Sequence, residues 1–317
     1  MPKTPSITHQ VSARLTSMLR IGEDKHAEKQ EGVTSKHIYS WGTYKTYRTK
    51  CIAFMKWAKE IYGCRTIAGA RPYVNVYMKH LIDSGYVAAS QKTISNSIAK
   101  MYRCSSTDFM PTQPRRRADI TRSRQGKANA RFFESKNQEF VDFCRATGLR
   151  RHEITNLRAE NIRYNEHTGN YYITGLKGKG GRMRDCPILS KAAVDRILNT
   201  PPRQRVWEKV LTNADIHSYR ADYCATIYEK YARPIADIPK KDRYYCRKDL
   251  RGVVYDKRAM AVASRVLGHN RISVIANNYL YTVARKQLEQ LEQLERLAQS
   301  QTQQPKLDEQ AQIAVVA

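Results

Sequence analysis

Three short segments, far apart in the chain, carry side chains that together could attack a phosphodiester. The first spans residues 146–154 and the second residues 217–220, while the third begins Leu-Gly-His at 267–269, with a tyrosine ten positions after the histidine. In chain order they contribute two arginines, two histidines and a tyrosine: Arg150, His217, Arg220, His269 and Tyr279. Each segment alone is weakly specific, so the ordered set is what indicates this chemistry.

Each of these residue types meets one difficulty of phosphodiester cleavage. The non-bridging oxygens are negative and need cations, and the leaving alkoxide needs an acid. A guanidinium stays charged at any working pH and can donate to two oxygens at once. A tyrosine is a poor nucleophile at its ordinary pKa of about 10. Beside two arginines its phenolate becomes accessible and can form a covalent phosphotyrosyl bond.

The spacing predicts which elements hold these side chains. Arg150 follows a glycine that ends one helix and precedes another, and Glu153 lies in the same helical turn. His217 and Arg220 are three residues apart, which places them on one face of a helix with Asp215 as its N-cap. Taken alone, Arg150 is more typical of a surface arginine, and a His-x-x-Arg pair is common by chance.

The length of 317 residues is comfortable for two domains. Residues 1–104 show apolar stripes of helical period over 41–61, 72–82 and 88–102, which predicts a helical domain. Residues 105–129 have little apolar periodicity and are predicted to be a basic interdomain linker. We expect this linker to lie along DNA phosphates, with a merely solvated tether as the alternative. Its candidate DNA-binding residues are Arg115, Arg116, Arg117, Arg122 and Arg124.

The second predicted domain, residues 130–285, changes from helical to strand periodicity and back. A helix is expected over 132–147, and strands near 162–164, 171–173 and 183–188 predict a small antiparallel sheet. Helices resume at Ser190. Residues 234–257 look like an insertion, a basic loop or hairpin that contacts DNA. Residues 286–317 are a C-terminal helix and tail whose leucine stripe is Leu288, Leu291, Leu294 and Leu297. The expected fold class is therefore mainly α with a small antiparallel β-sheet.

The charge indicates a polyanionic partner. The net charge is +27, from 56 lysines and arginines against 29 acidic residues, and such an excess favours nucleic acid. An anionic membrane is the competing interpretation, but the sequence has no long apolar run and no secretory leader. We therefore expect a soluble, intracellular protein. The seven cysteines form no Cys-x-x-Cys pair, so neither a disulfide framework nor a metal site is expected.

With these motifs in order, the chain resembles the tyrosine recombinases, the lambda-integrase family, and among them most the integrases of phages and conjugative transposons. The matching fragments are Thr147-Gly148-Leu149-Arg150-x-x-Glu153-Ile154, the turn Gly178-Lys179-Gly180, His217-x-x-Arg220 followed by Ala225-Thr226, and Leu267-Gly268-His269 leading to Tyr279. They span about half of the chain.

The resemblance implies a role for each matching residue. Arg150 and Arg220 would clamp the scissile phosphate, and Tyr279 would attack it to give a 3′-phosphotyrosyl bond and a free 5′-hydroxyl. Lys179 would protonate the departing 5′-oxygen. Lys177 also lies near that turn, but alignment without gaps back from Pro187 favours Lys179.

The remaining roles fall to two histidines and a glutamate. His217 would move the proton of the nucleophile, His269 would add a hydrogen bond to the phosphate, and Glu153 would steady the site. Where the family usually has arginine followed by histidine, this chain has Arg220-Ala221-Asp222. Because the bond energy is kept in the protein–DNA ester, the reaction needs no cofactor, neither ATP nor a metal.

The resemblance also implies an assembly. The two domains would form a C-shaped clamp on double-stranded DNA, and a homotetramer would exchange strands through a Holliday junction at the junction between element and chromosome. Accessory DNA-bending or excision proteins are possible partners. The protein would integrate or excise a mobile element in the cytoplasm of a bacterial cell. Two alternatives are a type IB topoisomerase, which cuts DNA similarly as a monomer, and a non-catalytic DNA-binding protein. The leucine-striped C-terminal helix favours the recombinase.

Overall fold

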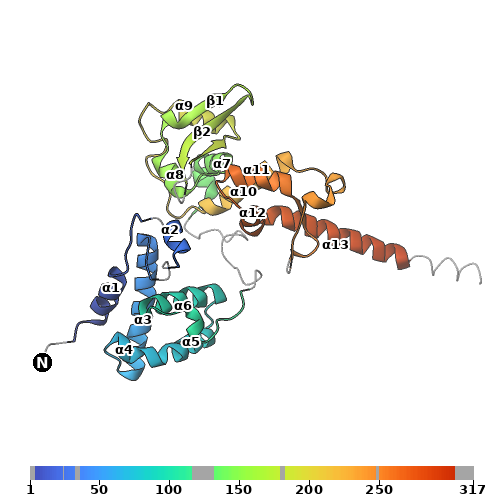
Figure 1. Ribbon diagram of the computed structural model, residues 1–317. Helices are drawn as coiled ribbons and strands as arrows, with labels where there is room; N and C mark the ends of the chain where they lie inside the picture. Colours follow the sequence, from blue (N-terminus) through green and yellow to red (C-terminus); the bar gives the residue numbers. More distant parts are fainter. Residues whose placement is uncertain are drawn as a thin grey trace, which may run out of the picture. The chain divides into compact units, whose positions relative to one another are not determined.

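The computed structural model describes residues 4–23, 25–32, 36–115, 132–178, 183–247 and 250–303 (Figure 1). The chain divides into two compact units, Met1–Ile120 and Thr121–Ala317, each with its own hydrophobic core. The first unit is built from helices, and the second combines helices with a small antiparallel sheet. The predicted fold class, mainly α with a small antiparallel sheet, is confirmed.

Unit 1 contains the helices expected from sequence and further short helices that were not expected. Its elements are α1 (Ile7–Thr16), α2 (Lys25–Gln30), α3 (Trp41–Tyr62), α4 (Ile67–Ala70), η2 (Arg71–Tyr73), α5 (Val74–Asp83), α6 (Ala88–Tyr102) and η3 (Ser106–Asp108). The helices α3, α5 and α6 match the predicted segments. The unexpected α1 begins where the Ser6 hydroxyl accepts from the His9 N–H, and it buries Val11 and Leu15.

The core of unit 1 forms where α3 packs against α1 and α6. Phe54 and Met55 of α3 are fully buried, as is Ile98 of α6, because the apolar residues of each helix recur on one face. The segment after α6 belongs to the same unit. The Met110 N–H donates to Asn75 of α5, and Phe109 packs beside it.

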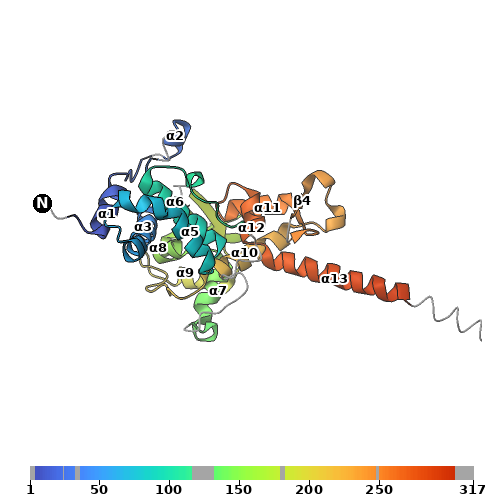
Figure 2. The same ribbon diagram turned by 90° about the horizontal axis from the view of Figure 1, so that it is seen from below.

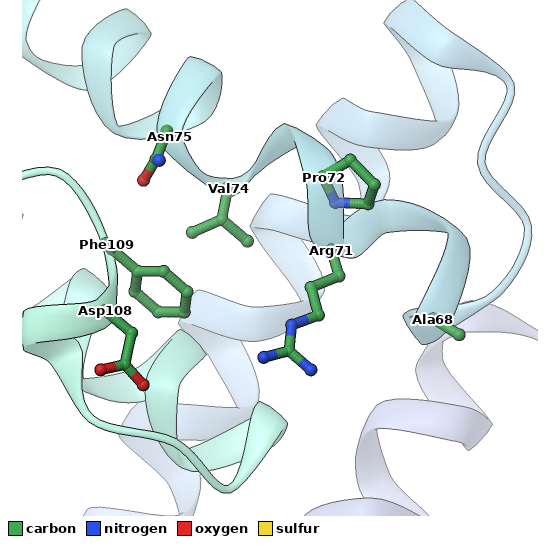
Figure 3. A pocket seen from close by; sticks show the side chains of 7 residues that line it. All are labelled: Ala68, Arg71, Pro72, Val74, Asn75, Asp108 and Phe109. Atoms are coloured by element: carbon green, nitrogen blue, oxygen red, sulfur yellow. The ribbon is translucent and has the colours of Figure 1, made fainter.

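A pocket of about 420 Å³ lies between this segment and α5 (Figure 3). Arg71, Asn75 and Phe109 are among the residues that line it. Of the arginines predicted to lie along DNA, Arg115 is described and exposed. The others, Arg116, Arg117, Arg122 and Arg124, lie outside the described residues.

The sheet of unit 2 has three antiparallel strands in the order β1-β2-β3: β1 (Ile162–Asn165), β2 (Asn170–Lys177) and β3 (Met183–Pro187). Ile173 pairs with Ile162 on one side and with Cys186 on the other. A turn follows β1, and the Asn165 side chain accepts from the Thr168 N–H there. Lys179, which falls between β2 and β3, lies outside the described residues.

Helices on both sides of this sheet in the sequence complete the unit. They are η4 (Glu134–Asn137), α7 (Gln138–Thr147), α8 (Arg151–Asn156), η5 (Ala159–Asn161), α9 (Lys191–Leu198), α10 (Ile216–Tyr231), α11 (Lys257–Val266), α12 (Ile272–Asn278) and α13 (Tyr281–Gln303) among the described residues. Helix α10 packs against both α7 and α11. Its Tyr223 and Cys224 are fully buried, so α10 is the central helix of the unit.

Residues 234–257 form a hairpin, one of the two expected shapes. After η6 (Ile235–Asp237) and η7 (Lys240–Asp242), strand β4 (Arg243–Tyr245) pairs antiparallel with β5 (Val254–Asp256). Arg233 holds its base with two hydrogen bonds to the Asp256 carboxylate, 2.7 and 2.8 Å long. The hydrogen bond from Arg233 lowers the pKa of Asp256 to about 2, so this pair is ionised at neutral pH.

The first turns of α13 pack on their own unit, whereas the later turns project from it (Figure 2). The Gln287 side chain donates to the Val254 carbonyl and accepts from the Val254 N–H, and Leu288 is partly buried against the core. Further along, Leu294 and Leu297 are 62% and 59% exposed. Despite the length of α13, no helix in the described part of the chain is long and apolar enough to cross a membrane.

Gly148 provides a stability test. It ends α7 at a φ of +56°, and a Cβ there would lie 2.2 Å from Cδ1 of Tyr223. Gly169 has a φ of +64° with nothing near its own Cβ position, so it shares the backbone strain without the clash. A left-handed alanine costs roughly 1–2 kcal/mol, and overpacking adds about 1–3 kcal/mol. We expect Gly148→Ala to lower the melting temperature of unit 2 well below that of Gly169→Ala. Equal losses would contradict the clash.

Candidate active site

Tyr279 lies where the three motif segments meet. It is the C-cap residue of α12 and is only 4% exposed. Its hydroxyl is 3.1 Å from Nε2 of His269 and 3.5 Å from Nε of Arg220. The His217 ring is also close, with its centroid 5.2 Å from that of Tyr279. Folding therefore brings three other predicted site residues close to the Tyr279 side chain.

Arg220 is held by backbone carbonyls from two loops. Its side chain is on α10, and the residue is 2% exposed. Nη1 donates to the Gly148 carbonyl, and Nη2 donates to the Leu267 carbonyl at 2.5 Å. Burial lowers the pKa of Arg220, and the nearby guanidinium groups lower it further, yet a guanidinium remains charged in proteins. The confirmed N-cap of α10, Asp215, accepts from the Ser218 N–H and fixes the start of this helix.

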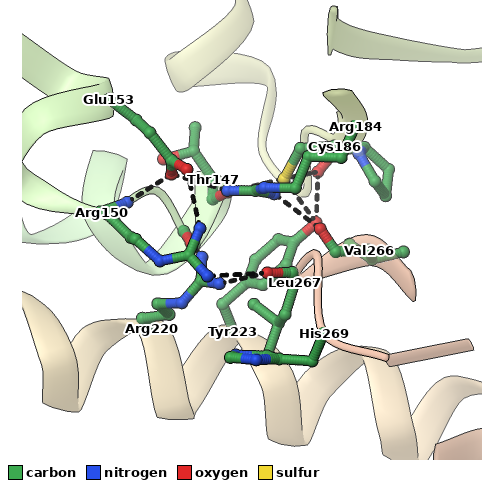
Figure 4. Close-up of polar contacts among 12 residues, drawn as sticks. Thr147, Arg150, Glu153, Arg184, Cys186, Arg220, Tyr223, Val266, Leu267 and His269 are labelled. Atoms are coloured by element: carbon green, nitrogen blue, oxygen red, sulfur yellow. Dashed lines mark hydrogen bonds and ion pairs between the residues drawn. The ribbon is translucent and has the colours of Figure 1, made fainter. Parts of the chain in front are cut away.

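Arg150 also reaches the Leu267 carbonyl (Figure 4). It is the N-cap residue of α8, and its Nη2 donates to the Leu267 carbonyl at 3.3 Å. Its Nη1 pairs with Oε1 of Glu153 at 2.9 Å, and its backbone N–H donates to Oε2 of the same carboxylate at 2.7 Å. One fifth of the Arg150 side chain stays exposed, so an anion can approach its remaining N–H groups.

Glu153 is the one carboxylate in a cluster of three guanidinium groups shown in Figure 4. Arg184 contributes the third, with Nη2 at 2.7 Å from Oε2 of Glu153. Burial alone would raise the pKa of Glu153, but Arg184, the Arg150 N–H and Arg220 outweigh that effect, and the pKa is lowered. The cluster thus keeps an excess of positive charge, which suits a bound phosphate.

His269 presents a neutral ring to Tyr279. It follows Gly268, which has a φ of +69° and turns the chain after α11, and its N–H donates to the Ser264 carbonyl. Burial, and then the charges of Arg220 and Arg150, lower the pKa of His269 to about 4. At neutral pH its Nε2 can therefore accept a hydrogen bond from the phenol.

A second tyrosine lies two residues later and has different partners. The Tyr281 hydroxyl is 3.4 Å from Oγ of Ser218, on the first turn of α10. Tyr279, by contrast, contacts His269 and Arg220 directly. This difference favours Tyr279 as the nucleophile.

Arg184 is the residue that the sequence interpretation missed. It lies on β3, where Arg184 and Cys186 alternate with exposed neighbours, and its side chain is only 4% exposed. The signal was present in the strand pattern, because alternation with Cys186 places an arginine on the inward face. Sequence alone did not show which carboxylate would receive it.

Two residues, Lys177 and Lys179, are candidates for the catalytic lysine. Lys177 ends β2 and is exposed, whereas Lys179 lies outside the described residues. Asp222, two residues after Arg220, pairs with Arg145 at 3.2 Å. Within the described ranges, no group of three or more histidine, cysteine or acidic side chains could hold a metal ion.

Comparison with known proteins gives matches among solved structures alone. No protein-family model and no curated protein matches the chain. The XerH site-specific recombinase bound to difH substrate is 12% identical with a TM-score of 0.42, over 86% of this chain and 91% of that one. The Tn1549 transposon integrase in complex with transposon right end DNA is 12% identical with a TM-score of 0.39, over 91% and 100%. These neighbours are tyrosine recombinases and integrases, the family that the motifs resemble. Similarity at this level does not decide activity, which must rest on the site.

The lowered pKa of His269 gives a testable titration. In the unfolded chain a histidine takes up its proton below about pH 6.5, whereas folded His269 does so near pH 4. The free energy of unfolding therefore decreases as pH falls from about 6.5 to about 4. The decrease is a fraction of the ~1.4 kcal/mol per pH unit that a full proton difference gives, because the ring is partly solvated. NMR titration of the imidazole signals, assigned with His269→Gln, should find this histidine neutral at pH ~5. A midpoint at the ordinary value would contradict the described environment.

Proposed function

We propose that this protein is a tyrosine-type site-specific DNA recombinase that cuts and rejoins strands through a covalent 3′-phosphotyrosyl intermediate. The observation that carries the proposal is the position of the Tyr279 hydroxyl, within hydrogen-bond distance of His269 and Arg220 and beside an excess of guanidinium charge. A nucleophile, a base and a cationic clamp are the parts that attack on a phosphodiester needs. A non-catalytic DNA-binding protein has no use for this juxtaposition.

The first step uses groups that already touch. The scissile phosphate binds to N–H groups of Arg150 and Arg220, and its negative charge offsets theirs, which makes His269 a stronger base. The Tyr279 oxygen transfers its proton to Nε2 of His269 and forms a bond to phosphorus, while the bond from phosphorus to the 5′-oxygen breaks. The resemblance to the tyrosine recombinases implied that His217 moves this proton. In the structure the Tyr279 hydroxyl lies 3.1 Å from Nε2 of His269, and we assign proton transfer to that nitrogen.

The departing 5′-oxygen needs a proton, and we propose Lys179 as its source. A lysine among glycines in a turn can approach a DNA backbone closely, and in the sequence Lys179 falls between β2 and β3, the strand that carries Arg184. His217, which is exposed beside the Tyr279 ring, would hold the phosphate. Rejoining is the reverse reaction with a 5′-hydroxyl as nucleophile. The guanidinium groups supply the positive charge, so no cofactor has a role in this scheme.

We also propose how the protein binds DNA, which site it acts on and which partners it has. The two units would grip double-stranded DNA as a C-shaped clamp, with the basic segment between them, including Arg115, along phosphates. The target would be the junction of a mobile element with a bacterial chromosome, where the protein integrates or excises the element. Accessory DNA-bending or excision proteins would act as partners in the cytoplasm.

The nucleophile can be tested by trapping. Nicked duplexes from a library of end-labelled element junctions should yield a covalent protein–DNA adduct with the wild-type chain, and the adduct should persist in EDTA. Tyr279→Phe should abolish it while binding the same DNA, because only the attacking oxygen is lost. Tyr281→Phe is the matched control and should retain it. An adduct that survives in Tyr279→Phe and disappears in Tyr281→Phe would move the nucleophile by two residues.

The exposed end of α13 supports assembly on DNA. Leu294 and Leu297 project from the unit, whereas Gln287 and Leu288 contact it. We propose that the exposed pair docks on a neighbouring protomer in a tetramer. The leucine stripe predicted from sequence is therefore divided, because Leu288 packs against the core of its own unit. A monomeric topoisomerase would need no such surface.

Substitution of the two exposed leucines tests this docking. Burial of each contributes roughly 1.5–3 kcal/mol, reduced by the ordering of the helix. Leu294→Ser with Leu297→Ser should leave folding and single half-site binding unchanged. Cooperative binding to paired sites, measured by gel shift, should fall at least about tenfold, and recombination should fall with it. Leu198→Ser, at an exposed leucine of α9, is the control. Unchanged cooperativity would show that α13 does not dock between protomers.

A further inference from the structure

Arg184 ties together the parts of the site while standing outside the predicted catalytic set. Its Nη2 binds Glu153 at 2.7 Å, and its Nη1 donates to the Val266 carbonyl at 2.6 Å. Glu153 in turn orients Arg150 through both the side chain and the backbone N–H. One guanidinium therefore connects β3 to the start of α8 and to the end of α11, two segments that carry motif residues.

The turn before His269 rests directly on this side chain. A Cβ on Gly268 would lie 2.7 Å from Cδ of Arg184, so the backbone has no room for a larger residue unless Arg184 moves. The preceding carbonyl, that of Leu267, accepts from both Arg150 and Arg220. Displacement of Arg184 would therefore disturb the carbonyl on which both clamp arginines converge, and with it the histidine one residue beyond Gly268.

Burial of an arginine side chain on a strand lowers the stability of the fold unless its charge is well paired. Transfer of a guanidinium into the interior loses solvation that an ion pair regains only with good geometry and further hydrogen bonds. Arg184 has an ion pair with Glu153, a hydrogen bond to the Val266 carbonyl and an interaction with the Cys186 thiol, and its Nε is buried without a hydrogen-bond partner among the described residues. An apolar side chain would serve the core of unit 2 at lower cost, so the position is explained better by the site than by stability.

We propose that Arg184 is a positioning residue for phosphodiester cleavage: it fixes Arg150 through Glu153 and fixes the Leu267–His269 turn through the Val266 carbonyl, without contacting the phosphate. This inference rests on the proposed recombinase function. It deepens that function by adding a residue on β3 to the machinery. The charge of Arg184 also contributes to the lowered pKa of His269.

The test compares Arg184→Met with Arg184→Lys. Misplacement of a reacting group by about 1 Å can cost about 10²-fold in rate. Arg184→Met should therefore bind selected junction DNA nearly as wild type and form the covalent adduct about 10²-fold more slowly in single turnover. Arg184→Lys keeps the charge on Glu153 but cannot also reach Val266, so it should recover part of the rate. Arg196→Met, which removes an arginine paired with Glu139 outside the site, should change neither measurement.

A second readout does not depend on cleavage. The charged and titratable groups around the His269 ring are Arg150, Arg184, Arg220, His217 and Tyr279. Loss of one positive charge in Arg184→Met should raise the pKa of His269 by NMR titration, whereas Arg184→Lys should leave it near the wild-type value. Should Arg184→Met fail to fold, Arg184→Lys carries the test through its slower cleavage at unchanged affinity.

The outcomes separate this inference from the proposed function. Absence of any adduct from the wild-type chain would refute the recombinase, and the titration would still report whether Arg184 acts on His269. Wild-type cleavage together with a folded Arg184→Met protein that cleaves within about threefold of it would overturn the positioning role. Equal losses of affinity and cleavage in Arg184→Lys would overturn it as well, because they indicate damage to the fold.

Discussion

The buried carboxylate of Glu153 is the interaction on which the site depends. Around it lie three guanidinium groups, those of Arg150, Arg184 and Arg220, two of them almost entirely removed from water. One carboxylate cannot neutralise three cations, and in a medium of low dielectric the surplus is felt strongly. The protein satisfies the guanidinium groups with backbone carbonyls, and the uncompensated charge favours an anion. The electrostatics of the fold therefore favour the binding of an anion beside Arg150.

Backbone carbonyls can serve this purpose only where the chain turns sharply. Gly148 and Gly268 both adopt positive φ, and both leave no space for a Cβ, against Tyr223 and Arg184 respectively. The carbonyl of Gly148 and that of Leu267, next to Gly268, then point at Arg220. The two glycines in the motifs are thus required by packing as much as by conformation, and they bring the ends of α7 and α11 close to one helix, α10.

The hairpin of residues 234–257 gives α13 its direction. Arg233 holds the base of the hairpin through the buried Asp256, and Val254 on its second strand exchanges two hydrogen bonds with Gln287. A two-stranded hairpin is marginal alone in water, so the helix and the hairpin stabilise each other. Beyond this contact the helix leaves the unit with Leu294 exposed. Residues 234–257, which look like an insertion in the sequence, therefore have a structural role within unit 2.

The sequence by itself determined the elements and the chemical inventory. Helical and strand periodicity located α3, α6 and the three-stranded sheet, since the side-chain period follows from local backbone geometry. The order of Arg150, His217, Arg220, His269 and Tyr279 indicated the kind of reaction. Local pattern grouped four leucines of α13 into one stripe, and it could not show that Leu288 packs on its own unit while Leu294 and Leu297 stay exposed.

Tertiary structure decided which groups touch. That His269 reaches the phenol, that Tyr279 differs from Tyr281 in its partners, and that Arg184 is part of the cluster all depend on contacts between residues tens of positions apart. Such distances are set by the packing of α10 against its neighbours and by side-chain burial, neither of which is encoded in local spacing. Burial also sets the pKa of His269, because a proton equilibrium depends on the charges and solvent that the whole fold places around the ring.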